Sequence, residues 1–265
     1  MLKYMAMVSS KYYIPEYSSE YLSMSCRGLD AYENDLLHIA VIHGPQGYGK
    51  STLAMQIAAE IEGYDFKTRT PGTNYKKALQ DFVFTPTQFI NKSNSTSGKK
   101  RVIVWDDAGF WISTADRYDA EVIAIGKYLE VARTDWATII FTCTDLSQLF
   151  NRIRHMPSAL SLKVTQQGKD KTHPHRRTAF TYRPWKSEDG SKGGRMLISI
   201  DIFQSRMPLY IYNQYVPFRD KFCSQGKYDW DEVLKLAKLK RYERQVSMKD
   251  RKQKLDKKTQ EMDLS

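Results

Sequence analysis

Residues 36–165 alternate between short apolar runs and segments whose apolar residues recur at helical spacing. Helical spacing is found at 51–61 and 118–133, and a short helix is expected at 146–156. Apolar runs typical of buried strands lie at 38–42, 81–84, 101–105, 137–142 and 159–164. The repeated order of strand, loop and helix predicts an α/β fold of three layers, in which helices cover both faces of a mainly parallel sheet.

One helix start can be read at residue level. In Thr85-Pro86-Thr87-Gln88, Thr85 is expected to be the N-cap, Pro86 the first helical residue and Gln88 the third. The polar run 91–98 predicts a loop soon afterwards.

The chain outside this region has a different character. Residues 1–35 are rich in Tyr, Ser and Met without a clear period, and we expect an irregular strap, with at most one strand, packed over the core. Residues 166–228 contain strand-like segments at 176–185 and 195–203, which predict a β-hairpin extension packed on the core. The aromatic residues of 210–218 are expected to pack back on that core. Residues 229–265 become dominated by Lys and Arg and predict a basic tail, helical or disordered.

The strongest chemical signal lies between the first strand and the first helix. Gly44-Pro45-Gln46-Gly47-Tyr48-Gly49-Lys50-Ser51 fits the phosphate-binding pattern G-x-x-x-x-G-K-[ST] without a mismatch. The glycines let backbone N–H groups turn toward an anion, and the helix that follows points its positive end at the same place. Lys50 is expected to contact the β- and γ-phosphates and Ser51 to ligate Mg²⁺, with Thr52 completing the ATP-binding set.

A second signal is the apolar strand 102–105, which ends in Asp106 and Asp107 and so has the Walker B pattern. We expect Asp106 to hold Mg²⁺ through water and Asp107 to act as the general base on the attacking water. Two adjacent acids favour ATP hydrolysis over phosphoryl transfer to a small molecule. At the end of the strand 137–142, Thr142 or Thr144 could sense the γ-phosphate, or either could simply end a strand.

Composition narrows the class of protein and its partners. The chain has 265 residues and 41% hydrophobic residues, enough for one large domain or a domain with an appendage. A net charge of +11 favours a polyanionic partner, although solubility could explain part of it. Three widely spaced cysteines predict reduced, buried thiols in a cytoplasmic protein, and no run approaches the length of a membrane span.

Three features leave alternatives open. Basic and aromatic residues interleave at 173–195, which fits either nucleic-acid contact or a solvated hairpin. The basic tail could likewise contact nucleic acid or a neighbouring subunit, or be a soluble tail. For the N-terminal tyrosines, contact with an adenine base is the alternative to packing over the core, and they are Tyr4, Tyr12, Tyr13, Tyr17 and Tyr21.

Together the motifs resemble ASCE-type P-loop ATPases, which have an extra strand between the two Walker strands. The residues that carry this resemblance are Gly44–Ser51, 102–107 and the strand at 138–144. The stretch 104–111, with 131–134 and 138–142, is similar to small ATPases of archaeal viruses and plasmids, which resemble replication-initiator and helicase-loader ATPases. The resemblance covers about residues 36–165. A hairpin in place of the helical lid of AAA+ proteins brings the chain nearer to packaging or export motors.

The resemblance implies a homo-oligomeric ring with an arginine finger that reaches the neighbouring site. The candidates are Arg133, Arg152 and Arg154, and an ordinary salt bridge explains each of them as well. The expected function is an Mg²⁺-dependent ATPase acting on DNA as a motor or loader in replication, segregation or packaging. The alternatives are an ATP-dependent switch or adaptor with little turnover and a nucleoside or nucleotide kinase. The kinase is disfavoured by the paired acids, by the basic second half and by the lack of an evident arginine-rich lid.

Overall fold

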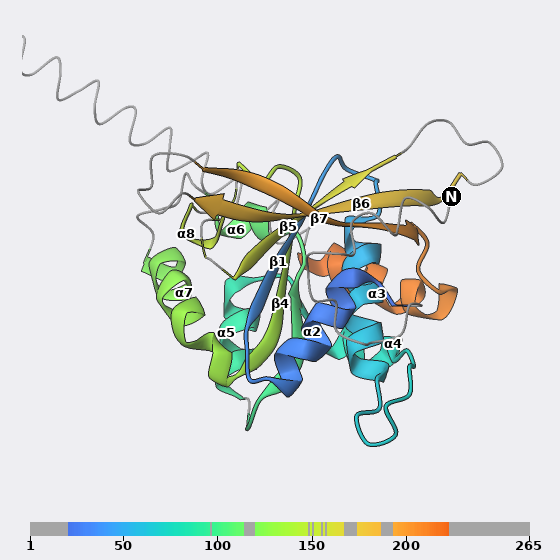
Figure 1. Cartoon of the computed structure of the whole chain (residues 1–265), viewed down its shortest axis with the longest axis horizontal. Coiled ribbons are helices and arrows are strands. Elements are labelled where there is room, and N and C mark those ends of the chain that lie inside the picture. Colours follow the sequence, from blue (N-terminus) through green and yellow to red (C-terminus); the bar gives the residue numbers. More distant parts are fainter. Residues whose placement is uncertain are drawn as a thin grey trace, which may run out of the picture. The chain divides into compact units, whose positions relative to one another are not determined.

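A mixed sheet organises the part of the chain that a computed structural model describes, residues 21–95, 97–113, 120–147, 149, 151–154, 156, 158–166, 174–186 and 193–222. The sheet has seven strands in the order β2-β3-β4-β1-β5-β6-β7 (Figure 1). The contact pattern divides the chain between Tyr215 and Val216, inside the helical residues 209–222, and the residues of the sheet and of the site described below lie in the first unit. The basic tail predicted at 229–265 lies outside the described residues.

Five strands are parallel and two are antiparallel, so the prediction of a mainly parallel sheet is confirmed. The parallel strands are β1 (His38–His43), β2 (Phe82–Val83), β3 (Lys100–Trp105), β4 (Trp136–Cys143) and β5 (Ala159–Thr165). Strands β6 (Arg176–Lys186) and β7 (Gly193–Gln204) pair antiparallel and continue the same sheet from β5. Strand β4, buried along its whole length, lies between β1 and β3.

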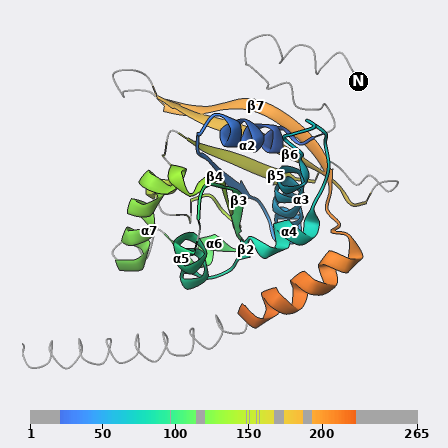
Figure 2. The ribbon, with the colours of Figure 1, turned by 90° about the horizontal axis from the view of Figure 1, so that it is seen from below.

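Helices cover both faces of the sheet. The described helices are α2 (Ser23–Glu33), α3 (Lys50–Gly63), α4 (Tyr75–Gln80), α5 (Pro86–Asn94), α6 (Ala108–Trp111), α7 (Ala120–Val131) and α8 (Asn151–Arg154), with a 3-10 turn at Ala132–Thr134 and helical residues at 209–222. Figure 2 shows α2 and α3 on the opposite side of the strands from α5 and α7. Because side chains alternate along a strand, each face of β1, β3 and β4 contributes to a different layer.

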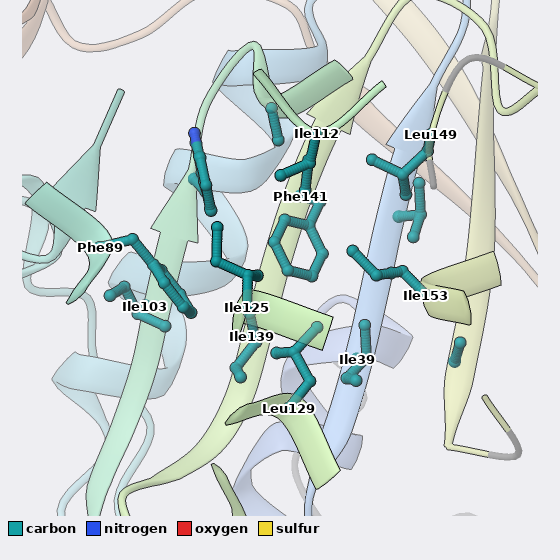
Figure 3. Packing of buried hydrophobic residues seen from close by; sticks show 14 of the residues in the cluster. Ile39, Phe89, Ile103, Ile112, Ile125, Leu129, Ile139, Phe141, Leu149 and Ile153 are labelled. Carbon is teal, nitrogen blue, oxygen red and sulfur yellow. The ribbon is translucent and has the colours of Figure 1, made fainter. Parts of the chain in front are cut away.

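Aromatic and branched side chains fill the layer under α5 and α7 (Figure 3). The ring of Phe89 stacks on that of Trp105, with 5.0 Å between the ring centroids. The ring centroid of Phe141 is 6.4 Å from that of Phe89. Trp105 is fully buried at the last position of β3. The packing therefore fixes the end of the strand that the two acids follow.

The N-terminal part that the structure describes is a helix, so the prediction of an irregular strap is wrong for residues 23–33. Helix α2 packs closely because Gly28 has no side chain. A Cβ there would lie 2.5 Å from Cδ1 of Ile61 and 2.8 Å from Oγ1 of Thr138. Ser23 also joins α2 to the sheet edge, since its N–H donates to Oδ1 of Asp201 on β7 at 3.0 Å.

Tyr21 does not lie near the glycine-rich segment. Its hydroxyl bonds to the carbonyl oxygen of Gly72, and its ring is 6.3 Å from that of Tyr64, just beyond α3. Helix α3 has 14 residues and begins at Lys50, so these two ends are about 20 Å apart. The other N-terminal tyrosines named above lie outside the described residues.

The start of α5 confirms the capping prediction. Oγ1 of Thr85 accepts from the N–H of Gln88 at 3.3 Å, and Oε1 of Gln88 accepts from the N–H of Phe84 at 2.8 Å. The helix continues to Asn94, so the predicted loop at 91–98 is wrong for its first four residues.

Several other predictions have partial outcomes. Within the aromatic segment 210–218, Ile211 and Tyr215 are buried, as expected, but Tyr210 and Tyr212 are exposed. Cys26 and Cys143 are buried thiols without a disulfide, and Cys223 lies outside the described residues. None of the helices in the described ranges combines the length and apolar character of a membrane span.

Replacing Thr85 by Ala tests the α5 cap. We expect the change to lower the free energy of unfolding by about 1 kcal/mol, because the N–H of Gln88 loses its acceptor. Denaturant unfolding measures the effect. Thr87→Ala is the matched control, since Thr87 is exposed in the same helical turn. Equal losses in the two variants would contradict the capping role.

Candidate nucleotide-binding site

The glycine loop, residues Gly44–Ser51, joins the end of β1 to the start of α3. Its three glycines have φ angles of +146°, +76° and +86° at Gly44, Gly47 and Gly49. The last two lie in the left-handed region that L side chains rarely adopt, and Gly49 is the N-cap of α3. The loop backbone can therefore curl tightly around a group that lies in front of the helix.

Lys50 and the first turn of α3 make this loop electropositive. Nζ of Lys50 donates to the carbonyl oxygens of Gly44 at 2.9 Å and Pro45 at 3.0 Å, and the residue is buried. The bond from the Leu53 N–H to the Gly49 carbonyl, at 2.9 Å, opens the helical ladder. The N–H groups of a first helical turn have no acceptor inside the helix and carry its positive dipole end. This combination attracts an anion such as a phosphate.

Asp106 follows β3 directly and its carboxylate is completely buried. Oδ1 accepts from Oγ of Ser51 at 2.9 Å and from Oγ1 of Thr142 at 2.6 Å, while Oδ2 accepts from the hydroxyl of Tyr215. Burial raises the pKa of Asp106, and the charge of neighbouring Asp107 raises it further, whereas the three hydrogen bonds act in the opposite direction.

Asp107 turns the chain sharply away from the strand. It has a φ of +53°, a left-handed conformation that aspartate tolerates better than most residues. Its N–H donates to Oγ1 of Thr142 at 2.7 Å. Thr142 thus holds the backbone of one acid and the carboxylate of the other. Unusual backbone conformations that are supported in this way occur often at functional sites.

Strand β4 brings the glycine loop and the two acids together at the carboxyl ends of the parallel strands. It pairs with β1 up to Cys143 and with β3 up to Phe141. The Gly44 N–H then donates to the carbonyl oxygen of Thr144 at 3.2 Å, just past the strand. In open α/β sheets, ligands bind at the carboxyl ends of the strands.

The other predicted residues are spread over the protein. Of the two candidate sensors, Thr142 contacts the acids, whereas Thr144 is exposed and contributes its carbonyl to the loop. Arg133 is exposed in the 3-10 turn before β4, at the amino end of that strand and so away from the two acids. Arg152 forms an ion pair with Glu130 of α7. The side chain of Arg154 lies outside the described residues.

The remaining loop residues frame the site. Pro45, Gln46 and Gly47 are exposed, and Tyr48 is half-buried. Oγ1 of Thr52 lies 3.5 Å from the carbonyl oxygen of Ser205.

Sequence reasoning missed two residues that lie at the site. Ser205, just past β7, lies so close to the loop that a Cβ at Gly49 would be 2.6 Å from the Cβ of Ser205. Tyr215 reaches Asp106 across 109 residues of sequence. The only signal for Tyr215 was its place in the aromatic segment 210–218.

The site has the oxygen ligands that Mg²⁺ uses. The hydroxyl of Ser51 and the carboxylate of Asp106 are adjacent, and Asp106 forms no salt bridge within the described residues. In the same part of the chain, no three His, Cys, Asp or Glu side chains gather to enclose a metal. Mg²⁺ typically takes one or two protein ligands, with phosphates and water supplying the rest. These residues therefore fit Mg²⁺ bound together with a phosphate ligand.

Comparisons with known proteins point to viruses of archaea. No known family model matches the chain. It is 23% identical over 226 residues to uncharacterized protein B-251 of Sulfolobus spindle-shape virus 1, covering 82% of this chain and 87% of that protein. It is 27% identical over 144 residues to uncharacterized protein ORF286 of Acidianus two-tailed virus, covering 52% of this chain and 47% of that protein. The similarity to proteins of archaeal viruses that the residues predicted is thus supported.

A weaker likeness exists among solved structures. The N-terminal domain of zonular occludens toxin from Neisseria meningitidis aligns with a TM-score of 0.35 and 15% identity, covering 62% of this chain and 95% of that domain. A score of this size does not establish a common fold.

Gly49→Ala, compared with Gly47→Ala, tests the contact between the loop and Ser205. Both variants force Ala into the left-handed region, but a Cβ at Gly47 meets nothing within 4 Å. Gly49→Ala should therefore lower the free energy of unfolding by about 1 kcal/mol or more beyond the loss from Gly47→Ala, because of overpacking. Denaturant unfolding of the two variants provides the measurement, and equal losses would rule out a rigid contact.

Proposed function

We propose that this protein binds ATP with Mg²⁺ and hydrolyses it. The observation that carries the proposal is the contact between Oγ of Ser51 and Oδ1 of Asp106, 2.9 Å apart. It joins the end of the phosphate-binding pattern to the first acid of the Walker B pattern. In P-loop NTPases, residues of these two types hold the metal beside the β- and γ-phosphates.

Each residue has a distinct part in the proposed reaction. The backbone of the glycine loop and the first turn of α3 bind the phosphates, and Lys50 neutralises charge on the β- and γ-phosphates. Bound at Ser51 and Asp106, Mg²⁺ would supply positive charge for the phosphate oxygens. Asp107 orients a water molecule and accepts its proton while the water oxygen bonds to the γ-phosphorus. The bond to the β-γ bridging oxygen breaks, and ADP and phosphate are the products.

Two observations favour hydrolysis over the alternatives. The second acid, Asp107, directly follows the proposed metal-binding acid Asp106. Its backbone N–H is held by the hydroxyl oxygen of Thr142. The strand order, with β4 between the strands that carry the two motifs, supports the proposed resemblance to ASCE-type ATPases. An ATP-dependent switch with little turnover would use the same loop and metal ligands, so the two functions are separated by the rate of phosphate release.

Lys50→Ala and Asp107→Asn separate binding from hydrolysis. We expect Lys50→Ala to abolish detectable ATP binding, with Lys67→Ala, in an exposed turn, as control.

Asp107→Asn should retain ATP binding but lower kcat by about 100-fold or more, because the general base is lost. Asp35→Asn is the matched control, since Asp35 is an exposed aspartate with a φ of +51° ahead of β1. Unchanged kcat in Asp107→Asn would exclude this base, and negligible phosphate release by the wild type would favour the switch.

The proposed partner is DNA, bound through the basic surface of β5, β6 and β7. Lys163 and Arg195 are exposed on these strands, and the side chain of Trp185 is 46% exposed. Cations can pair with phosphates and an exposed indole can stack on a base. The net charge of +11 supports a polyanionic partner. A role in replication, segregation or packaging would follow from this contact.

Charge reversal at Lys163 and Arg195 tests this surface. The double change to Glu should weaken DNA binding and reduce the slope of log affinity against log salt by about 1 for each lost phosphate contact. Fluorescence anisotropy over a salt series measures both quantities. A double change of Lys67 and Lys76 to Glu, at two other exposed positions, is the control for net charge. The same loss in both double variants would contradict a contact specific to this surface.

Assembly into a ring is the last part of the proposal. In such a ring an arginine from one subunit would approach the γ-phosphate bound by its neighbour. Arg133 is exposed, and Arg152 would have to exchange its ion pair with Glu130 for that role.

A further inference from the structure

Tyr215 connects a late segment of the chain to the candidate metal site. It lies in the helical residues 209–222, outside both nucleotide-binding motifs, and its hydroxyl bonds to Oδ2 of Asp106. Ser205, at the start of the same segment, approaches the glycine loop at Gly49. Residues 205–215 therefore contact both the phosphate-binding and the acidic parts of the site.

The ring of Tyr215 is held in one place by its neighbours. The residue is only 4% exposed, and its ring centroid is 6.1 Å from that of Phe82 and 5.9 Å from that of Phe84. Ile211, one helical turn earlier, is completely buried. Because packing fixes the ring, the hydroxyl has a defined position relative to Asp106.

The hydrogen bond completes the set of contacts that orients the Asp106 carboxylate. Oδ1 accepts from Ser51 and Thr142, whereas Oδ2 accepts from Tyr215. Because both oxygens have donors, the three bonds together restrict rotation of the carboxylate about its Cβ–Cγ bond. Groups that orient a metal-binding side chain commonly affect metal affinity, although they do not touch the metal.

We propose that Tyr215 is a positioning residue that fixes Asp106 for binding Mg²⁺ with the nucleotide. The inference rests on the proposed function, because it assumes that Ser51 and Asp106 hold the metal. Tyr215 acts only through Asp106, so it affects the metal-dependent part of nucleotide binding. The phosphate contacts of the glycine loop and Lys50 do not depend on it.

Tyr215→Phe tests the inference, because it removes the hydroxyl and keeps the packed ring. Affinity for a fluorescent ATP analogue is measured without metal and over a Mg²⁺ titration. Without metal, we expect the variant and the wild type to bind the ATP analogue with equal affinity. The Mg²⁺ concentration that gives half of the metal-dependent gain in this affinity should be about tenfold higher in the variant. Direct binding of Mn²⁺ in the presence of the nucleotide, followed by electron paramagnetic resonance, should weaken to a similar extent. Tyr212→Phe is the control, since Tyr212 is 51% exposed on the same helix.

A second variant, Tyr215→Leu, separates positioning from packing. If the hydroxyl acts through Asp106, the Phe and Leu variants shift the Mg²⁺ midpoint equally, even where Leu lowers the melting temperature further. The inference is overturned if Tyr215→Phe titrates like the wild type, or if only Tyr215→Leu shifts the midpoint. These outcomes leave the proposed function intact as long as the wild type binds the nucleotide in a Mg²⁺-dependent way. A wild type without such binding would instead contradict the proposed function itself.

Discussion

The buried carboxylate of Asp106 is the constraint on which the site depends. A carboxylate without exposed surface loses its hydration, and this loss must be offset by hydrogen bonds or by a cation. The three donors come from the start of α3, from β4 and from the helical residues 209–222. Segments that are distant in sequence must therefore meet at this side chain.

The order of the strands follows from the same requirement. Thr142 can bond to Asp106 and to the N–H of Asp107 because β4 lies directly beside β3. The glycine loop reaches the acid from the other side of β4, since β1 also pairs with that strand. Exchanging β4 with β1 or β3 would put those two strands side by side and remove Thr142 from its place between the two motifs. The position of β4 is thus part of the chemistry as well as of the fold.

Sequence predicted those parts of the structure that are determined locally. The glycine loop, the strand that ends at Asp106 and the cap at Thr85 each depend on a few consecutive residues. Helix α2 was missed because its buried positions include Ser25, Cys26 and Gly28, which do not form an apolar stripe. Its place depends on distant partners: Glu60, for example, accepts from the hydroxyl of Ser25 at 2.6 Å.

The choice between Thr142 and Thr144 could not be made from sequence for a related reason. Side chains two residues apart in a strand face the same side, so alternation treats both threonines alike. The difference arises where the strand stops: β4 ends at Cys143, which leaves Thr142 inside the sheet and Thr144 beyond it. The end of a strand is set by its pairing partners, here β1 and β3, and not by its own residues.

The contacts of Ser205 and Tyr215 change how the chain should be divided. The family resemblance covers residues 36–165, and both nucleotide-binding motifs lie within them. In the structure, burial of Asp106 also depends on Tyr215, and the backbone of Gly49 lies against Ser205. Without this later segment, Oδ2 of Asp106 would lose its hydrogen-bond donor. The antiparallel strands and the helical residues after them are therefore better regarded as part of the site than as an appendage to it.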